Sequence, residues 1–240
     1  MMTNDRAPVD SEKVWRYMGF SRFVWLLQKK QLWLSRADLL GDPWEISLAG
    51  DQLAHVISRH PLTDILSPEV PESAMQRSAR IIRLWRWHTF VNCWSVSNHE
   101  SHALWRIYCP PREGVAIQTT LAKLRASVGD LRVLPVTYEI PGCNRRTPIR
   151  EDLVTKKRLM FAYEQEVRIV HFADINDVED IQPKTLGHSL EWELGAVESI
   201  RVHPEADHSF METVRTTVEN YAPALRDRVE WSAMNAPPPF

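Results

Sequence analysis

The segment 163–168 carries two glutamates and an arginine at alternate positions, in the sequence Tyr-Glu-Gln-Glu-Val-Arg. On a β-strand every second side chain points to the same face, so Glu164, Glu166 and Arg168 are predicted to line up together. Two carboxylates that lie close raise each other's proton affinity and can divide the work of general base and charge stabiliser. Catalysis is one interpretation. The other is a solvent-facing strand in which Arg168 neutralises the glutamates.

Arg16 lies on a second predicted strand, between Trp15 and Tyr17. It shares a strand face with the apolar residues Val14 and Met18. A guanidinium in such surroundings needs a partner, because buried arginines are rare unless they are paired. That partner is either a structural carboxylate or a phosphate-bearing ligand, since the planar fork of arginine suits both.

Two serines, in the sequence Ser95-Val96-Ser97, end a third predicted strand. Ser97 is expected to cap the helix that follows, because Ser97 and Glu100 have the spacing of a capping box. Ser95 has two interpretations. An inward hydroxyl would hold a neighbouring carboxylate, and otherwise Ser95 is an ordinary strand residue.

Two other groups of residues have the chemistry of metal ligands without a full ligand set. Asp42 and Glu45 flank a proline turn, and two carboxylates alone make a weak cation site. His99 and His102 lie one helical turn apart without a third ligand nearby, which favours surface histidines over zinc. The sequence therefore predicts no metal.

Arginine recurs at every third position of a long predicted helix that opens with a Ser73 capping box. This spacing drifts by about 60° per step, so the arginines go around the helix and favour a solvated polar face. The alternative is a nucleic-acid surface with stacking platforms. It would use Arg77, Arg80, Arg83, Arg86, Arg145 and Arg146, with Trp87 or Trp105 as the platforms.

Several segments together resemble a family of bacterial proteins catalogued as domain of unknown function 2971. The resemblance extends over roughly residues 15–201, and the chain departs from the family in having Gly41 where an Asn is usual. The motifs are Trp15-x-Tyr17, Leu34-Ser35, Gly41-Asp42-Pro43-Trp44-Glu45, Leu104-Trp105-x-x-Tyr108, Gly114-Val115-Ala116-Ile117 and Tyr163-Glu164-x-Glu166-x-Arg168.

A remoter resemblance is to ADP-ribosyltransferases of the arginine–serine–glutamate class. These enzymes carry an aromatic-Arg pair on the first strand, Ser-x-Ser on a middle strand and Glu-x-Glu late in the chain. Arg16, Ser95-x-Ser97 and Glu164-x-Glu166 occur here in that order. The resemblance implies a mono-ADP-ribosyltransferase that consumes NAD and acts on an intracellular protein or nucleic acid, in phage defence or as a toxin.

The same resemblance assigns roles to individual residues. Arg16 would hold the phosphates or ribose of NAD, and Ser95 would position Glu166. Glu166 would stabilise the positive charge that develops as the glycosidic bond breaks, as a carboxylate does in glycoside hydrolysis. Glu164 would orient or deprotonate the acceptor. The aromatic rings that could stack on nicotinamide are those of Trp15, Tyr17 and Tyr163.

The positions of these candidate site residues are set by short, irregularly spaced strands that alternate with helices. We expect an α+β fold with a mixed or antiparallel sheet flanked by helices, in a single domain over residues 11–232 with mobile tails at 1–10 and 233–240. Strands are predicted at 14–18, 31–37, 91–96, 114–119, 131–138, 163–172 and 197–203. Helices are predicted at 21–30, 48–58, 98–108, 147–161 and 210–221 and after Ser73, with connections at 60–71 and 141–148.

Composition limits the class of protein. The chain has 240 residues, 44% hydrophobic and 25% charged, with a formal net charge of -2, which is typical of a cored protein and excludes strong global attraction to nucleic acid. No apolar run approaches the roughly 20 residues of a membrane span, and no secretory signal is visible. The scattered Cys93, Cys109 and Cys143 suit a reduced, cytoplasmic location. A nucleic-acid-binding or noncatalytic interaction protein without NAD chemistry is the alternative to the transferase.

Overall fold

The computed structural model describes residues 7–47, 73–109, 111–140, 149–175 and 184–236. The predicted helix at 48–58 and the connections at 60–71 and 141–148 lie outside these residues. Within them, no helix has the length and apolar character needed to cross a membrane.

A nine-stranded sheet forms the centre of the molecule, and its main path has the order β11-β10-β4-β1-β3-β2-β9. β8 pairs with the other edge of β3, and β5 pairs with β8. All pairs in this sheet are antiparallel except β10 with β11, so the predicted α+β fold with a mixed sheet is confirmed. The strands are β1 (Lys13–Gly19), β2 (Gln31–Arg36), β3 (Thr89–Val96), β4 (Gly114–Thr120), β5 (Arg132–Pro135), β8 (Glu166–Phe172), β9 (Gly187–Glu191), β10 (Ser199–Val202) and β11 (Val229–Trp231). A separate parallel pair joins β6 (Thr137–Glu139) to β7 (Lys156–Arg158).

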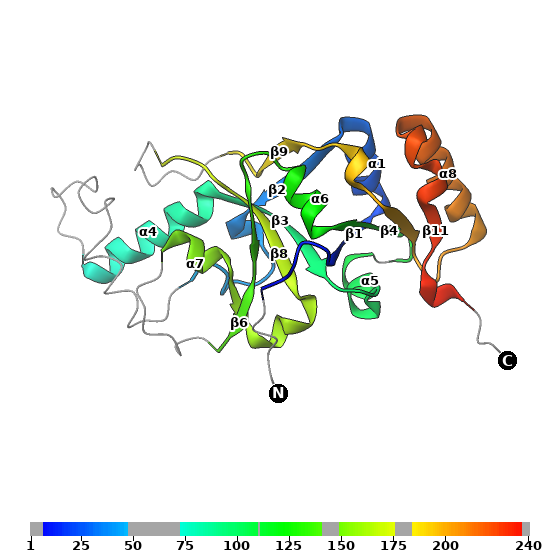
Figure 1. The fold of residues 1–240 in the computed structure, drawn as a ribbon. Helices are drawn as coiled ribbons and strands as arrows, with labels where there is room; N and C mark the ends of the chain where they lie inside the picture. Colours follow the sequence, from blue (N-terminus) through cyan, green and yellow to red (C-terminus); the bar gives the residue numbers. More distant parts are fainter. Residues whose placement is uncertain (1–6, 48–72, 110, 141–148, 176–183, 237–240) are drawn as a thin grey trace.

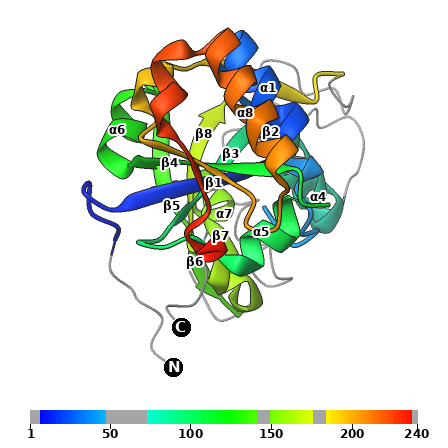
Figure 2. The ribbon, with the colours of Figure 1, turned by 90° about the vertical axis from the view of Figure 1, so that its right-hand side faces the viewer.

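Helices cover the sheet and extend beyond it. In Figure 1, α4 and α8 lie at opposite ends of the molecule with the sheet between them. Figure 2 shows α1 and α8 side by side, in agreement with their contacts. The α-helices are α1 (Phe20–Lys29), α4 (Ala74–His88), α5 (His102–Tyr108), α6 (Leu121–Ala126), α7 (Arg150–Val154) and α8 (His208–Tyr221). Short 3-10 helices are η1 (Ala37–Leu39), η2 (Leu159–Glu164), η3 (Leu194–Ala196), η4 (Pro223–Arg228) and η5 (Ala233–Asn235).

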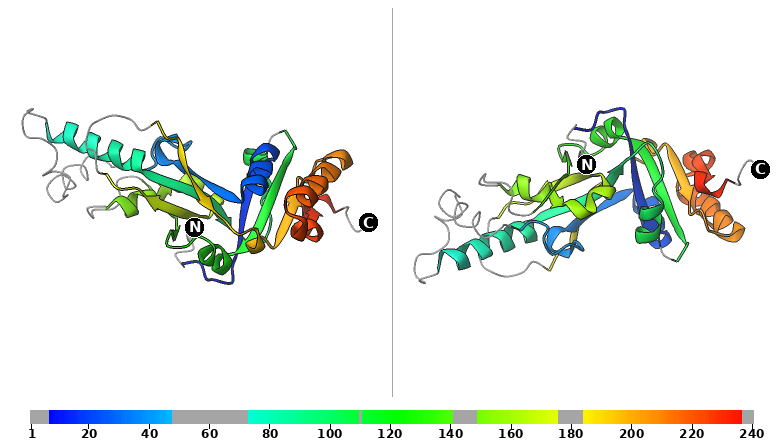
Figure 3. Two further views of the ribbon diagram at one scale, coloured as in Figure 1. Left: turned by 90° about the horizontal axis from the view of Figure 1, so that it is seen from above. Right: turned by 90° about the horizontal axis from the view of Figure 1, so that it is seen from below.

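The sheet forks at β3. β8 follows the whole of one edge of β3, from Thr89 to Ser95. The other edge is shared, because β1 pairs only with its last two residues and β2 only with Phe90 and Val91. Figure 3 shows β1 and β4 running steeply across the direction of β8, so β1 leaves β3 soon after they meet. A gap between β1 and β2 therefore opens along β3.

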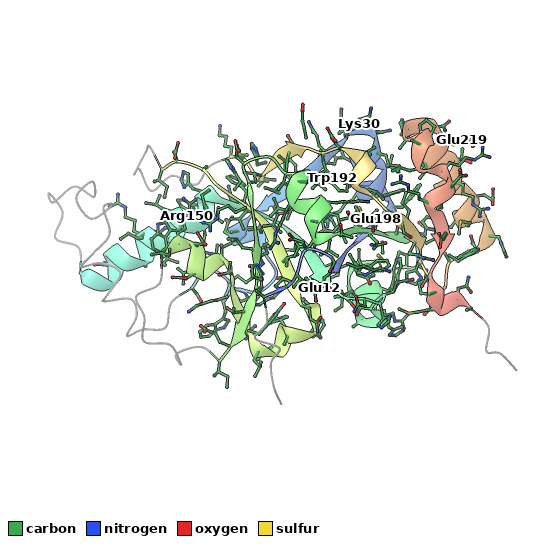
Figure 4. The ribbon with its side chains drawn as sticks, viewed as in Figure 1. Glu12, Lys30, Arg150, Trp192, Glu198 and Glu219 are labelled. Carbon is green, nitrogen blue, oxygen red and sulfur yellow. The ribbon has the colours of Figure 1, made fainter. Side chains whose placement is uncertain are left out.

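The two faces of β8 enter different parts of the core. Val167 and Ile169 join the largest hydrophobic cluster, which includes residues of α1, α6 and α8. It also includes the edge-to-face pair of Trp94 with Trp192, and Figure 4 labels Trp192. Val170 joins a second cluster that α4 and α7 cover. Because side chains alternate along a strand, Glu166 and Arg168 lie on the face of this second cluster.

The local sequence explains the ends of several elements. Ser73 caps α4 in the predicted capping box, and the Asp207 side chain caps α8. The predicted cap at Ser97 is wrong. The side chain of Ser101 accepts the bond from Leu104 N and begins α5, whereas Ser97 Oγ accepts from His99 N.

Two predicted elements in the second half of the chain are also wrong. Instead of one helix over 147–161, the described residues form α7, β7 and the start of η2. β7 depends on its parallel pairing with β6, a tertiary contact that leaves no local pattern. The strand expected at 163–172 begins only at Glu166, and the strand expected at 131–138 is divided into β5 and β6.

Candidate active site

Strand pairing places three of the predicted site residues in one row across the sheet. Trp15 of β1 lies opposite Ser95 of β3, and Ser95 lies opposite Glu166 of β8. Directly opposite residues in an antiparallel sheet point to the same face. Ser95 and Glu166, which are 71 positions apart in the sequence, therefore lie side by side.

Glu166 and Arg168 form a buried ion pair. Arg168 is completely buried, and it donates to Glu166 Oε2 from Nε (3.0 Å) and Nη2 (2.6 Å). Its Nη1 donates to the Val154 carbonyl at the end of α7 (2.7 Å). The alternative of a solvent-facing strand is therefore wrong for these two residues. Both bonds from Arg168 end on the same oxygen of Glu166.

Glu164 is not on the strand with Glu166, contrary to the prediction. It ends η2, and Gln165 then adopts a left-handed conformation (φ 43°) before β8 begins. The chain nevertheless returns Glu164 to the same cluster. Lys157 Nζ bonds to the carboxylate of Glu164 and lies 3.6 Å from Glu166 Oε2, so the two glutamates share one lysine.

The loop with Asp42 and Glu45 completes the cluster. Glu45 Oε2 lies 2.7 Å from Arg168 Nη1, and Glu45 Oε1 lies 3.5 Å from Lys157 Nζ. Asp42 accepts two hydrogen bonds from Arg158 (3.0 and 2.8 Å). The two carboxylates considered as cation ligands are thus paired with protein cations. Among the described residues, no group of three or more His, Cys, Asp or Glu is placed to hold a metal.

Lys157 is a site residue that the sequence reasoning missed, and Glu45 was considered only as a cation ligand. Lys157 falls in the segment predicted as a helix, where nothing marks it as buried. The motif around Glu45 was visible, but its partners are more than 100 positions away. Only the tertiary structure brings Lys157 and Glu45 to the two glutamates.

The cluster carries one net negative charge when all its groups are ionised. It contains three carboxylates, those of Glu45, Glu164 and Glu166, and two cations, Lys157 and Arg168, which gives 2 − 3 = −1. All five side chains are buried. Such a cluster attracts either a proton or a cationic ligand group.

The pKa values of the two catalytic candidates are driven apart. Burial raises the pKa of Glu164, and the neighbouring Glu166 and Glu45 charges add to the effect, although Lys157 opposes it. Burial also acts to raise the pKa of Glu166, but the charges of Arg168 and Lys157 outweigh it, so the net shift is downward. Glu164 is therefore the better proton acceptor and Glu166 the more persistent anion.

Two exposed tyrosines lie beside Glu164. Tyr108 at the end of α5 donates to Glu164 Oε1 (3.4 Å), and Tyr163 precedes Glu164 in the chain. Both rings are nearly half exposed. Tyr138 lies on the inner side, where its hydroxyl accepts from Glu166 N (2.7 Å). The ring of Tyr163 is thus accessible, and its contact with nicotinamide stays a prediction.

Trp15 and Tyr17 are placed differently from Tyr163. Trp15 is buried and donates from its indole to the Ser97 carbonyl (2.9 Å). Tyr17 is also buried, accepts from Ser101 N (2.7 Å) and packs edge-to-face on Trp105 with ring centroids 5.1 Å apart. Both rings are core components that hold α5 against β1. The stacking role expected for them does not fit this packing.

Arg16 reaches into the fork of the sheet. Its Nη1 donates to the Cys93 carbonyl (2.7 Å), on the stretch of the β3 edge that neither β1 nor β2 covers. Burial lowers the pKa of Arg16 to about 10, and the charge of Glu166 is near enough to act against this shift. In the part of the chain that the structure describes, Arg16 has no carboxylate partner within ion-pair distance. On its other side, Arg16 lines a cavity of about 380 Å³.

Both stacking platforms of the nucleic-acid alternative, Trp87 and Trp105, are buried. Trp105 is completely buried and Trp87 is 9% exposed, so neither offers a stacking face. The guanidinium of Arg83 lies over the Trp87 ring, 5.8 Å from its centroid. Arg145 and Arg146 lie outside the described residues, as does the side chain of Arg77.

The fold and site define an α+β protein with a forked sheet and a buried ionic cluster beside the fork. Comparison of the chain with protein-family models, with curated proteins and with solved structures finds no match in any of the three. The resemblances seen in the sequence therefore stay predictions. The arrangement of the residues is what supports a function.

Proposed function

We propose that this protein is an ADP-ribosyltransferase-type enzyme that consumes NAD. One observation carries the proposal: Ser95 and Glu166 lie opposite each other on β3 and β8, and Glu164 shares Lys157 with Glu166. Arg16 starts on the other face of the sheet, and its side chain reaches the Cys93 carbonyl of β3 at the fork. The resemblance singled out Arg16, Ser95 and both glutamates, and β3 lies between the strands of Arg16 and Glu166. The opposite pKa shifts of the two glutamates add support, because the reaction needs one lasting anion and one proton acceptor.

In the proposed reaction, the bond between the nicotinamide nitrogen and ribose C1′ breaks, and nicotinamide leaves with the bonding electron pair. Positive charge then develops on the ribose. Glu166, kept ionised by Arg168 and Lys157, stabilises this charge. An acceptor N–H, O–H or S–H group attacks C1′, and its proton passes to Glu164. The products are nicotinamide, the ADP-ribosylated acceptor and the proton on Glu164.

Two residues position the reactants. Arg16 would contact the phosphates of NAD, since its guanidinium has only a backbone carbonyl as a hydrogen-bond partner in the described structure. Ser95 would fix the carboxylate of Glu166, which lies opposite it on the neighbouring strand. Tyr163, which is exposed beside Glu164, would stack on the nicotinamide ring.

The test is release of nicotinamide from NAD by the purified full chain. We expect release by the wild type and a rise in thermal midpoint with NAD, because a ligand that binds only the folded state stabilises it. Glu166→Gln and Ser95→Ala should lower release, Glu166→Gln by about 100-fold or more. Glu212→Gln, in an exposed pair on α8, is the matched control.

A protein that neither releases nicotinamide nor is stabilised by NAD would contradict the proposal. The five paired charges would then support the noncatalytic alternative, in which they join the Glu45 loop, β7, η2 and β8 into a scaffold. The acceptor, whether protein or nucleic acid, is a separate question that the nicotinamide assay does not depend on.

A further inference from the structure

The cavity at the fork combines positive charge with aromatic surface. It has a volume of about 380 Å³, which lies within the range of small-molecule sites. α1 connects the two strands that border it, β1 and β2. The side chains that matter for its chemistry are those of Arg16, Arg22, Trp25, Gln31, Trp33 and Ser35.

The two arginines of the cavity lack negative partners. Arg16 donates only to a backbone carbonyl, and Arg22 is exposed with no hydrogen bond or ion pair from its side chain in the described structure. Burial is the main cause of the lowered pKa of Arg16, and the nearby positive charge of Arg22 adds to this lowering. Two unpaired like charges around one cavity cost free energy, and an anion between them would remove that cost.

The start of α1 adds to the positive potential. Gly19 at the N-cap offers no side-chain cap, and Ser21 and Arg22 in the first turn both line the cavity. The first turn of a helix has free backbone N–H groups and carries the positive end of the helix dipole. A phosphate in the cavity would therefore meet the helix N-terminus as well as two guanidinium groups.

Trp33 provides a flat apolar surface in the same cavity. Its side chain is 41% exposed, which is unusual for so large an apolar group, and it packs edge-to-face with Trp25 (ring centroids 6.2 Å, 88°). Gly187 of β9, which pairs with Ser35, permits this position. A Cβ at Gly187 would lie 2.4 Å from the Trp33 ring. An exposed indole of this kind is a platform for a planar base.

The lining of the cavity comes from both faces of the sheet. Met18, Leu26 and Leu32 belong to the hydrophobic cluster under α1. Ser35 lies opposite Val91, so Trp33 and Ser35 point to the face of β3 that also carries Ser95 and Glu166. Arg16 lies at the fork, beside both the cavity and the ionic cluster. A ligand long enough to extend from the cavity through the fork would contact Arg16 on the way.

We infer that the cavity binds the adenosine diphosphate half of a dinucleotide, with phosphates at Arg16 and Arg22 and the base on Trp33. Binding of a phosphorylated nucleotide follows from the cavity itself, and the assignment to half of NAD rests on the proposed function. The nicotinamide ribose would then extend past Arg16 towards Glu166. Arg22, Trp25 and Trp33 thereby become specificity residues that no catalytic step requires.

Calorimetric titration of the full chain with ADP, adenosine and inorganic pyrophosphate tests this inference. We expect ADP to bind at least 10-fold more tightly than adenosine. Arg22→Ala should weaken ADP binding about 10-fold, as expected for loss of a charged hydrogen bond, without changing adenosine binding. Trp33→Ala should weaken ADP and adenosine binding alike and leave pyrophosphate binding unchanged. Arg215→Ala and Trp44→Ala, at exposed positions outside the cavity, are the matched controls.

The results separate this inference from the proposed function. Nicotinamide release combined with ADP affinities for Arg22→Ala and Trp33→Ala within twofold of the wild type would overturn the inference alone. ADP binding that both variants weaken, without any release of nicotinamide from NAD, would overturn the proposed function and leave a nucleotide site. Both residues lie at the surface, and unchanged thermal midpoints of the unliganded variants confirm that they fold.

Discussion

Glu166 depends on its neighbours to remain charged in the interior. Arg168 donates two hydrogen bonds to it and is itself completely buried, so each residue compensates the charge of the other. Arg168 also lies 2.7 Å from Glu45, so loss of Glu166 would remove charged hydrogen bonds, each typically worth about 1.5–3 kcal/mol, and leave Arg168 with one carboxylate. The site and the stability of the fold are therefore coupled at this residue.

Glu166→Gln should lower the free energy of unfolding by about 1.5–3 kcal/mol at neutral pH, because Arg168 loses charged hydrogen bonds but keeps Glu45 as a partner. The pKa of Glu166 is lower in the folded than in the unfolded protein, so its charge stabilises the fold above its unfolded pKa. This contribution is lost as the pH falls through the folded pKa. The difference between variant and wild type should therefore shrink on acidification below the ordinary glutamate pKa, which urea unfolding at pH 7 and near pH 3 would measure. A difference that does not change with pH would contradict this account.

Glu164→Gln should act on rate and pH profile. Because the pKa of Glu164 is raised by burial, the wild-type transfer rate should climb with pH through a value above that of an ordinary glutamate. Glutamine cannot take the acceptor proton, so the variant should lose this acidic limb and be slower in transfer by about 10²–10⁴-fold. Initial rates of ADP-ribose transfer between pH 4 and 9 provide the measurement. Glu164→Asp, which keeps the carboxylate, should retain the limb.

At the scale of elements, Gln165 determines the relation between the two glutamates. Its left-handed backbone ends η2 and turns the chain into β8, while its side chain is exposed. Gln165→Val should destabilise the protein by about 1–2 kcal/mol, since β-branched residues adopt this conformation poorly. Gln165→Gly is the matched control, because glycine accepts positive φ and should not destabilise by a similar amount. Thermal unfolding of the three proteins decides the matter, and equal loss in both variants would contradict a backbone cause.

The elements that could be predicted from the sequence are those with a local pattern. β1, β4 and α8 follow from runs of apolar residues with strand or helix spacing, and α4 begins at its capping box. The end of η2 could not be predicted, because glutamine is not a residue typical of the left-handed conformation. β7 could not be predicted, because it forms by pairing with β6. The resemblance singled out Arg16, Ser95 and Glu166, and the sheet register places Ser95 opposite Glu166. The roles of Lys157 and Glu45 as partners were not predicted, since ion pairs across the fold leave no sequence spacing.

At the scale of the whole molecule, three hydrophobic clusters meet around β3. One lies under α1, α6 and α8, a second under α4 and α7, and a third joins β1 to α5 through Trp15, Tyr17 and Trp105. Arg150, which is labelled in Figure 4, connects α7 to the sheet, because its Nε donates to Thr89 Oγ1 (2.9 Å). The ionic cluster lies between the second and third clusters, so distant parts of the chain support it.

Glu100 extends this support to the last described segment of the chain. It accepts from Trp105 Nε1 (3.0 Å), Ser232 Oγ (2.5 Å) and Ala233 N (2.9 Å), and so joins α5 to the residues after β11. α5 in turn carries Tyr108, which donates to Glu164. A single buried carboxylate therefore connects the C-terminal segment with the edge of the site.

Glu100→Ala should release this connection without unfolding the sheet. Two part-buried donors and one exposed donor would lose their acceptor, so residues 229–235 and α5 should exchange backbone hydrogens at least 10-fold faster than in the wild type. Glu230→Ala is the matched control on the same segment, because its ion pair with Arg201 (2.6 Å) is half exposed and worth at most about 1 kcal/mol. Hydrogen exchange followed by mass spectrometry resolves both regions. Faster exchange confined to 229–235, with α5 unchanged, would show that α5 is held by its core packing and that Glu100 does not support Tyr108.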